Sequence, residues 1–462
     1  MLKYNANLDI KNIPKYDKNF IPIYKYFNEF STKADKPIAI ALESGSNEVS
    51  VYETSIFSGE GMNYANKLYL EKLVKFLIWS RGGYKIYICG DKELYKYIKD
   101  TYSHIGKRKF DYNFMSQVYD RELVIEYLDY NKRPVVKEFG RKVGGNLEGC
   151  RIGFDAGGSD CKISAVIDGK RVFSKEIIWY PKENNNPDYH YQEILKALKS
   201  AAVHLPRVDA IGVSTAGIVV NDYIKASSLF IKVKRNLFNK KVQDIYLRVA
   251  KEIGEIPIMV ANDGDVSALA GAMALKSGQV FGIAMGTSEA VGYIDKEGNI
   301  VGWLNELAFA PVDLYEGAME DEWSGDLGVG CKYFSQDAVL KLASVAGIKL
   351  AEKLKPAQKL KKVQRLIEKN DNRAWNIYDT IGCYLGHTIP LYDHFYNIKH
   401  IILLGRATSG KGGNIMLKTV KKVLKEEYPN VYEKIEIKLP DENLRRIGQS
   451  FAAASLPKLG NK

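Results

Sequence analysis

A regular alternation of strands and helices begins at Arg151, and it constrains the fold more than any other feature of this chain. Apolar segments typical of strands occur at 151–155, 162–167, 171–178, 208–214, 256–263, 280–286, 290–295 and 400–404. Segments with helical periodicity lie among them, near 188–204, 239–253 and 266–276. Strands that alternate with helices predict a largely parallel sheet with helical cover, so residues from 151 onward are expected to form an α/β fold.

The first two strands enclose a loop with the chemistry of a phosphate site. The stretch RIGFDAGGSDCKISAVIDGKRVF (151–173) places Asp155 where the first strand ends, followed by Gly157, Gly158 and Ser159. Glycines let the backbone approach a ligand closely, and the aspartate is placed to reach a metal ion. By itself such a loop is more simply interpreted as a plain hairpin turn. The interpretation as a phosphate site is supported by three further loops.

The second loop contains a candidate general base. In VANDGDVSALAGA (260–272) a strand gives way to a helix, and Asp263 stands at the junction. A strand-end carboxylate faces the cleft where open α/β sheets bind ligands, so Asp263 could take a proton from a hydroxyl group. An aspartate in this position is otherwise a helix N-cap, and Asp265 is the more natural cap because VSALAG begins directly after it.

The third and fourth loops complete the pattern. Gly286, Thr287 and Ser288 repeat the strand, glycine-hydroxyl turn and strand of the first loop, and two such hairpins could surround a triphosphate with N–H and O–H donors. The loop LLGRATSGKGG (403–413) nearly fits the GxxxxGK[ST] phosphate loop, but glycine follows Lys411 where a hydroxyl should hold magnesium. A glycine-lined surface for an adenosine therefore fits this loop better.

Residues 151–462 resemble the ROK family (repressors, open reading frames, sugar kinases) of the actin and hexokinase superfamily. Five segments carry the resemblance in the family's order: DAGGSDCK (155–162), GVSTAGIV (212–219), ANDGDVSALAGA (261–272), GTSEAVGYI (286–294) and IILLGRATSG (401–410). The resemblance implies a two-lobed actin/hexokinase-like (ribonuclease H-like) ATPase fold. It also implies ATP and Mg²⁺ as cofactors, a sugar or polyol substrate, and a homodimer.

The resemblance also assigns roles to individual residues. Asp263 would be the catalytic base, Asp155 would hold Mg²⁺ through water, and Asn262 and Glu306 would orient substrate hydroxyls. The nucleotide-binding residues would be Asp155, Gly157, Gly158, Ser159, Lys162, Gly286, Thr287, Ser288, Gly405, Thr408 and Gly410.

The chain departs from the family's pattern on the sugar side. Sugar-binding members carry GExGH, and the nearest match here is NELAF (305–309), in which Phe309 replaces the histidine. The CxCGxxGC cluster is absent and Cys331 is the cysteine nearest to its place, so no zinc site is expected. Asp160 adds a negative charge beside the first phosphate loop. Glu306 keeps the carboxylate that would contact a sugar.

The first 148 residues are expected to form a region of their own. They hold two strands in 38–57, a helix at 66–81 and a strand at 84–90, and the glycine-rich stretch 137–150 reads as a linker. They have no counterpart in the usual kinases of the family. We therefore expect an N-terminal α/β accessory region (1–148), a first ATPase lobe (149–263 plus about 446–462) and a second lobe (264–445).

Composition narrows the functional classes. The net charge of +12 comes with no helix-turn-helix, zinc-finger or aromatic-basic pattern, so no nucleic-acid partner is expected. No apolar run is long enough to span a bilayer and no signal peptide is evident, which predicts a cytoplasmic protein without membrane contact. The five cysteines are dispersed, as expected of reduced thiols.

These features favour ATP-dependent phosphorylation of a sugar or a similar hydroxyl compound. Two alternatives stay open: a non-catalytic protein that senses a sugar or nucleotide, and an ATPase coupled to a protein partner.

Overall fold

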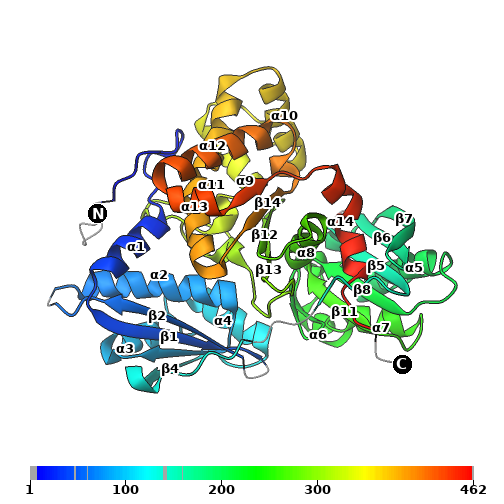
Figure 1. Ribbon diagram of the computed structural model, residues 1–462, viewed down its shortest axis with the longest axis horizontal. Helices are drawn as coiled ribbons and strands as arrows, with labels where there is room; N and C mark the ends of the chain where they lie inside the picture. The colour runs from blue at the N-terminus through cyan, green and yellow to red at the C-terminus, as the bar shows by residue number, and fades with distance from the viewer. Residues whose placement is uncertain (1–7, 46–47, 60, 139–142, 159, 460–462) are drawn as a thin grey trace. The chain divides into compact units, whose positions relative to one another are not determined.

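The computed structural model describes residues 8–45, 48–59, 61–138, 143–158 and 160–459, and only the backbone of residues 442–447. The chain divides into two units (Figure 1). Unit 1 comprises residues 1–139, 283–291 and 302–439, and unit 2 comprises residues 140–282, 292–301 and 440–462.

Unit 2 is built on a five-stranded sheet in the order β11-β8-β5-β6-β7. The central strand β5 pairs antiparallel with β6 and parallel with β8, and β8 pairs parallel with β11. The strands are β5 (Cys150–Ala156), β6 (Asp160–Ile167), β7 (Lys170–Ile178), β8 (Ala210–Thr215) and β11 (Ile258–Asn262). The helices are α5 (Pro187–Ala202), α6 (Arg235–Lys241), α7 (Ile245–Lys251), α8 (Asp263–Leu275) and α14 (Glu442–Ala454). The α/β fold expected from the sequence is confirmed, but the sheet is not largely parallel, because β5–β6 and β6–β7 are antiparallel hairpin pairings.

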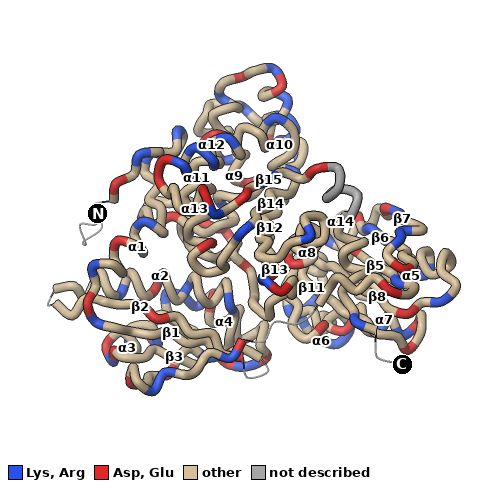
Figure 2. Tube along the Cα trace, in the orientation of Figure 1, with Lys and Arg blue, Asp and Glu red and all other residues tan. Residues whose placement is uncertain are grey.

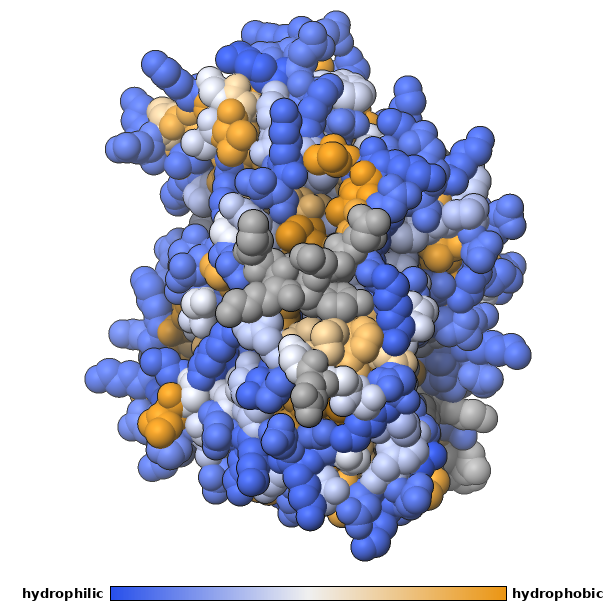
Figure 3. All heavy atoms as spheres, turned by 90° about the vertical axis from the view of Figure 1, so that its left-hand side faces the viewer, coloured by the Kyte–Doolittle hydropathy of each residue, from blue (hydrophilic) through white to orange (hydrophobic). Residues whose placement is uncertain are grey.

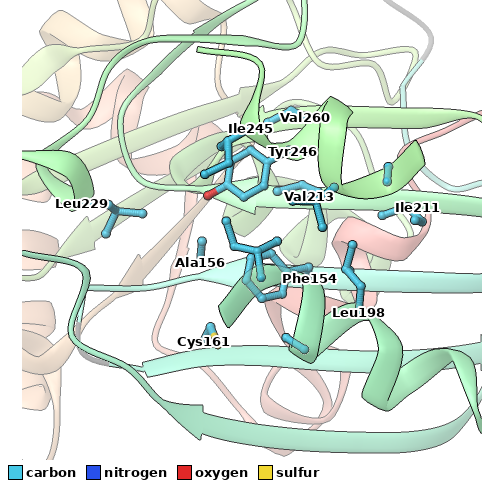
Figure 4. Close-up of a cluster of buried hydrophobic side chains, with 14 of the residues drawn as sticks. Phe154, Ala156, Cys161, Leu198, Ile211, Val213, Leu229, Ile245, Tyr246 and Val260 are labelled. Atoms are coloured by element: carbon cyan, nitrogen blue, oxygen red, sulfur yellow. The ribbon is translucent and has the colours of Figure 1, made fainter. Parts of the chain in front are cut away.

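The two faces of β5 bury different partners, because successive side chains of a strand point to opposite sides. Ile152, Phe154 and Ala156 belong to an apolar core that includes Leu198 of α5 and Tyr246 of α7 (Figure 4). The intervening residues face α14. All seven residues of β5 are buried, so polar chemistry on this strand can reach a ligand only where the strand ends.

Helix α14 lies directly against the backbone of the sheet. Gly153 of β5 pairs with Gly212 of β8, so two glycines stand side by side on this face. A methyl group on Gly153 would overlap the carbonyl oxygen of Ser450, and one on Gly212 would overlap that of Ala453. The two glycines therefore create the groove that α14 occupies.

Unit 1 contains two sheets. The N-terminal sheet has the order β2-β1-β3-β4 and the second has the order β13-β12-β14-β15. The strands are β1 (Lys36–Glu43), β2 (Val49–Ile56), β3 (Lys85–Cys89), β4 (Val124–Leu128), β12 (Val280–Met285), β13 (Glu289–Ile294), β14 (His400–Leu404) and β15 (Glu436–Lys438). The boundary between the units falls inside β12 and β13.

The helices of unit 1 fall into two groups along the chain. Those of the first 139 residues are α1 (Ile23–Lys33), α2 (Asn63–Arg81), α3 (Lys92–Thr101) and α4 (Lys109–Tyr119). Those of the later segment are α9 (Gln336–Val345), α10 (Pro356–Glu368), α11 (Asn372–Tyr396), α12 (Lys411–Glu427) and α13 (Pro429–Lys434). The first 139 residues pack with residues 302–439 in the same unit. The division into three domains given above stays a prediction.

Three local expectations need correction. The stretch after β8 forms a hairpin of β9 (Ile218–Val220) and β10 (Tyr223–Ala226) that the sequence pattern did not indicate. The helix predicted over 239–253 is two helices, α6 and α7, separated by three residues, 242–244. Helix α8 starts at Asp263, three residues earlier than its apolar periodicity suggested, because Asn262 caps it.

Charged residues are spread over both units, with basic and acidic positions intermixed along the chain (Figure 2). The face shown in Figure 3 is largely hydrophilic, with hydrophobic side chains in scattered groups. Among the described residues, no helix is both long and apolar enough to cross a membrane.

Replacing Gly153 with alanine tests the packing of α14. The added methyl group cannot fit against the carbonyl of Ser450, so we expect the free energy of unfolding to fall by about 1–3 kcal/mol or more. Gly254→Ala is the matched control, since the nearest atom to its new methyl group lies 3.7 Å away. Urea unfolding measures both; equal stabilities would contradict the packing described.

Candidate active site

The end of β5 carries a buried carboxylate. Asp155 is 6% exposed, and its Oδ1 accepts a hydrogen bond of 2.8 Å from the Ser214 hydroxyl of the neighbouring strand β8. Parallel pairing of β5 with β8 places Asp155 directly beside Ser214, which explains the contact. The second carboxylate oxygen stays available for another ligand.

The glycine loop after β5 is held from two sides. The indole N–H of Trp179 donates to the carbonyl of Gly157 at 2.8 Å, and a Cβ on Gly157 would come within 2.6 Å of the Asp160 carbonyl oxygen. The side chain of Lys182 lies over Gly158, with Cε and Nζ at 3.0 and 3.3 Å from the position of an added Cβ. An ammonium group therefore stands beside the loop. The predicted phosphate ligand Ser159 lies outside the described residues.

Asp263 is the first residue of α8, and the helix cap is its neighbour. The Asn262 side-chain oxygen accepts from the Gly264 N–H at 2.7 Å, which is the N-cap contact. Both Asp263 and Asp265 were considered as caps from the sequence, and both assignments are wrong, because the extended backbone of Asn262 ends the strand and starts the helix at once. The Asn262 amide nitrogen donates to the carbonyl of Gly217 at 2.8 Å, so both ends of this amide have protein partners.

The two carboxylates of unit 2 influence each other. Burial raises the pKa of Asp155 to about 6. Burial and the charge of Asp155 raise the pKa of Asp263 to about 7, and the charge of Lys182 acts in the opposite direction. Two carboxylates with raised pKa values favour a nearby cation, and a carboxylate with a pKa near neutrality suits a general base.

The donor set fits a magnesium ion held mainly through water. Mg²⁺ takes oxygen ligands, usually keeps several waters and is bound by one or two carboxylates together with substrate phosphates, and Asp155 with Asp263 offers that set. No cluster of three or more His, Cys, Asp and Glu side chains that could hold a metal occurs in the part of the chain that the structure describes. Lys162 lies 3.9 Å from Asp160, so the negative charge next to the loop is partly balanced.

The second phosphate hairpin, between β12 and β13, forms a tight turn in unit 1. The Gly286 N–H donates to the Ser288 carbonyl at 3.0 Å, and the Gly286 carbonyl accepts from the N–H of Gln336, the first residue of α9, at 2.8 Å. Thr287 and Ser288 are exposed, so their hydroxyl groups are available to a ligand.

The loop after β14 is shaped by glycines. Gly405 has φ 96°, and a side chain there would overlap the backbone of Met285. Gly410 (φ 68°) is the N-cap of α12, and the Thr408 hydroxyl donates to the Gly405 carbonyl at 2.9 Å, so Thr408 stabilises the loop itself. Lys411 forms an exposed ion pair with Glu368 at 3.2 Å.

The segment with the predicted substrate contact also lies in unit 1. Glu306 precedes a single turn of 3₁₀ helix (Leu307–Phe309), and the Phe309 ring is 8% exposed. Glu289, the first residue of β13, is buried nearby: the Tyr392 hydroxyl donates to its Oε1 at 3.1 Å, while Oε2 has no hydrogen-bond partner. Burial, with a smaller contribution from the charge of Glu306, raises the pKa of Glu289 to about 8, although the hydrogen bond from Tyr392 acts in the opposite direction.

The sequence patterns did not indicate three residues described above: Trp179 and Lys182 in unit 2, and Glu289 in unit 1. Lys182 lies in a loop without any motif spacing, and Trp179 precedes it, so nothing in the pattern linked either to the glycine loop. Glu289 offered a signal, because a carboxylate opens the otherwise apolar strand EAVGYI directly after the hydroxyl turn.

A family model named ROK family matches residues 151–443, well over half of the chain. The chain belongs to the ROK family. No curated protein sequence matches this ROK protein in a sequence search.

Solved structures of ROK proteins share its fold. A ROK family transcriptional regulator, a homolog of the E. coli MLC protein, superposes with a TM-score of 0.52 at 15% identity, covering 67% of this chain and 79% of that one. The ROK hexokinase from Thermus thermophilus superposes with a TM-score of 0.51 at 17% identity, covering 66% of this chain and 96% of that one. A ROK family glucokinase from Streptomyces griseus, in complex with glucose and AMPPNP, superposes with a TM-score of 0.50 at 16% identity, covering 68% of this chain and 100% of that one. The chain thus has the actin/hexokinase-like fold expected from the motifs.

Replacing Glu289 with glutamine tests its protonation. In the unfolded chain a glutamate loses its proton near pH 4.5, whereas folded Glu289 keeps it to about pH 8. Between these values the unfolded state binds fewer protons, so this residue makes the free energy of unfolding fall as the pH rises. We expect Glu289→Gln to reduce the loss of stability between pH 5 and pH 8, measured by urea unfolding. The exposed Glu297→Gln should leave that loss unchanged; an unchanged loss in Glu289→Gln would contradict the assignment.

Proposed function

We propose that this ROK protein transfers the γ-phosphoryl group of ATP to a hydroxyl group of a sugar or sugar-like compound. The observation that carries the proposal is a pair of carboxylates with raised pKa values, the buried Asp155 and the partly exposed Asp263, beside a glycine loop and the ammonium group of Lys182. Phosphoryl transfer requires phosphate-binding donors, a cation and a positioned base, and this group of residues supplies the ligands and the base.

In this proposal Asp263 accepts the proton of the acceptor hydroxyl while the hydroxyl oxygen forms a bond to the γ-phosphorus. The bond between that phosphorus and the β–γ bridging oxygen breaks, and ADP leaves with the bond's electron pair. Mg²⁺, when bound through water to Asp155, would neutralise charge on the phosphates. The N–H groups around Gly157 and Gly158 would bind phosphate oxygens, and Lys182 would add a charged donor.

Unit 1 would supply the remaining contacts. The Gly286–Ser288 turn would offer its N–H and hydroxyl groups to the phosphates. The surface at Gly405 and Gly410, stabilised by Thr408, would support the adenosine. Glu306 would orient hydroxyl groups of the acceptor.

One observation favours a second candidate, a non-catalytic regulatory protein that senses a sugar or nucleotide. Phe309 stands where sugar-binding relatives carry a polar residue, and its ring is packed against other aromatic rings. Turnover of ATP with and without a panel of monosaccharides separates the candidates. Sugar-dependent turnover supports the kinase, sugar-independent turnover an ATPase, and binding without turnover a regulatory protein.

Asp263→Asn should abolish phosphorylation and spare nucleotide binding. Loss of a general base lowers the turnover rate by about 10²–10⁴-fold, whereas an amide of equal size leaves the shape of the site unchanged. Coupled assays measure turnover and calorimetry measures nucleotide binding. Asp244→Asn, which alters an ion pair with Arg248 on the surface of unit 2, is the control. Full activity of Asp263→Asn would rule out this base.

Lys182→Met should weaken nucleotide binding. A charge-assisted hydrogen bond to phosphate contributes on the order of 1.5–3 kcal/mol, so the Kd for ATP should rise about tenfold or more. The exposed Lys170→Met serves as control for the loss of one positive charge. An unchanged Kd for ATP in Lys182→Met would remove this residue from the site.

A further inference from the structure

One face of α2 carries polar side chains although it is completely buried. Glu71, Lys75 and Trp79 follow one another at four-residue intervals, so they lie in one row along the helix. Their exposed fractions are 1%, 0% and 0%. Such a face is unusual for a structural helix, whose buried side is normally apolar.

The end of this helix holds the segment that contains Glu306. We call residues 304–309 the acceptor segment. Its backbone N–H groups at 304, 305 and 306 donate to the carbonyls of residues 81, 80 and 79 at 3.2, 3.0 and 2.9 Å. The last four carbonyl groups of a helix have no partner within the helix, and the acceptor segment supplies hydrogen-bond donors to three of these carbonyls in α2. The backbone next to Glu306 is therefore fixed by the N-terminal region.

A buried ion network ties a second loop to the same face. Lys75 binds Asp111 at 2.9 Å and Asp326 at 2.6 Å, and Arg108 binds Asp326 and, at 2.8 Å, Glu71. Asp326 ends the acidic loop, which we define as residues 321–326, whereas the other four residues belong to the N-terminal region. Removing one partner from a buried network is strongly destabilising, so this network holds the acidic loop in one position.

Aromatic rings fill the space between the two loops. The ring centroids of Phe309 and Trp79 lie 4.6 Å apart. The ring centroid of Trp323 lies 5.3 Å from those of Phe309 and Phe110 and 5.7 Å from that of Phe114. Trp323 is nevertheless 64% exposed. It is a rigidly supported indole with a free surface, next to the segment that carries Glu306.

The rings of this cluster that support Trp323, those of Trp79, Phe110, Phe114 and Phe309, have no polar hydrogen left for a ligand. The indole N–H of Trp79 donates to Asp111 at 2.7 Å, and the phenylalanine rings have no polar group. A ligand that packs on the exposed Trp323 therefore meets an indole ring backed by the buried Phe309 ring, and such ring surface favours apolar groups.

We propose that the N-terminal region completes the acceptor side of the site. In this proposal the Glu71–Lys75–Trp79 face positions Glu306 and Phe309, and Trp323, supported by the buried Phe309 ring, forms an aromatic wall for an acceptor that has an apolar face, such as an aryl glycoside. The proposal rests on the kinase function proposed above, because it concerns the acceptor of that reaction.

The positioning role is tested with Asp326→Asn in the full-length protein. This change leaves the pairs Lys75–Asp111 and Arg108–Glu71 intact and weakens only the tie to the acidic loop. We expect the KM for the acceptor to rise about tenfold or more while the KM for ATP stays within about twofold. Asp91→Asn, which loses an ion pair with Lys36 elsewhere in the N-terminal region, should change neither. Unchanged acceptor KM, or equal changes in both KM values, would overturn the positioning role.

The acceptor class is tested by comparing glucose, mannose and galactose with their phenyl glycosides. We expect kcat/KM to be at least about tenfold higher for one phenyl glycoside than for its free sugar, and Trp323→Ala to remove this preference. Trp375→Ala is the matched control, since Trp375 is an exposed tryptophan of the same unit on α11. Equal values for both members of every pair, or a preference that survives in Trp323→Ala, would overturn the aromatic wall.

Calorimetry on the same proteins separates this proposal from the proposed function. If no compound stimulates ATP turnover but a phenyl glycoside binds the unmodified protein and not Trp323→Ala, the kinase function fails and the aromatic wall stands. If neither class of compound binds, the acceptor proposal fails whether or not ATP is hydrolysed.

Discussion

The complete burial of strand β5 is the constraint on which the architecture of unit 2 depends. Its alternate residues face the core formed with α5 and α7 on one side and α14 on the other, and Gly153 brings α14 against the backbone itself. A strand covered in this way cannot expose a functional group along its length. Asp155 is polar because it stands at the end of the strand, and the neighbouring strands β8 and β11 end at the same edge of the sheet with Ser214 and Asn262. The chemistry of this unit is thus concentrated at one edge by packing.

Buried carboxylates occur in two opposite electrostatic environments in this protein. In the N-terminal region burial would raise the pKa of Glu71, but the charges of Arg108 and Lys107 lower it to about 2, and the charges of Lys75 and Arg108 likewise lower the pKa of Asp326. At the carboxyl ends of β5 and β11, the charges of Lys162 and Lys182 lower the pKa values of Asp155 and Asp263 less than burial raises them, so both pKa values are raised. Paired carboxylates are satisfied by the protein itself and hold loops in place. Carboxylates without an ion pair favour a proton or a cation, which is why the second group, and not the larger first group, indicates a binding site.

The sequence predicted those features that depend on neighbouring residues. Local periodicity determines the strands beside each glycine turn and the order of strands and helices from Arg151 onward. The strands β5 to β8 and β11 to β14 were therefore predicted, whereas the short hairpin β9–β10 was not. Contacts between distant segments could not be predicted in this way. Lys182 reaches Gly158 from another loop, and α2 meets residues 304–306 across more than two hundred positions. Even the start of α8 depended on a single side chain, because Asn262 and not an aspartate offered its oxygen to the Gly264 N–H.

The buried ring of Phe309 and the N-terminal region depend on each other. An imidazole at position 309 would be enclosed by Trp79, Phe110 and Phe114, whose one polar hydrogen is already bound to Asp111. Burying an imidazole without a hydrogen-bond partner is unfavourable, whereas a phenyl ring gains from the same contacts. Conversely, without α2 and α4 the Phe309 ring would lose its apolar surroundings, and Asp326 would lose both of its cationic partners. A chain without its first 139 residues would therefore lose both ion pairs of Asp326 and three of the rings around Phe309. Within the later segment only the Phe309–Trp323 contact and the pairing of Lys332 with the acidic loop would remain among these interactions.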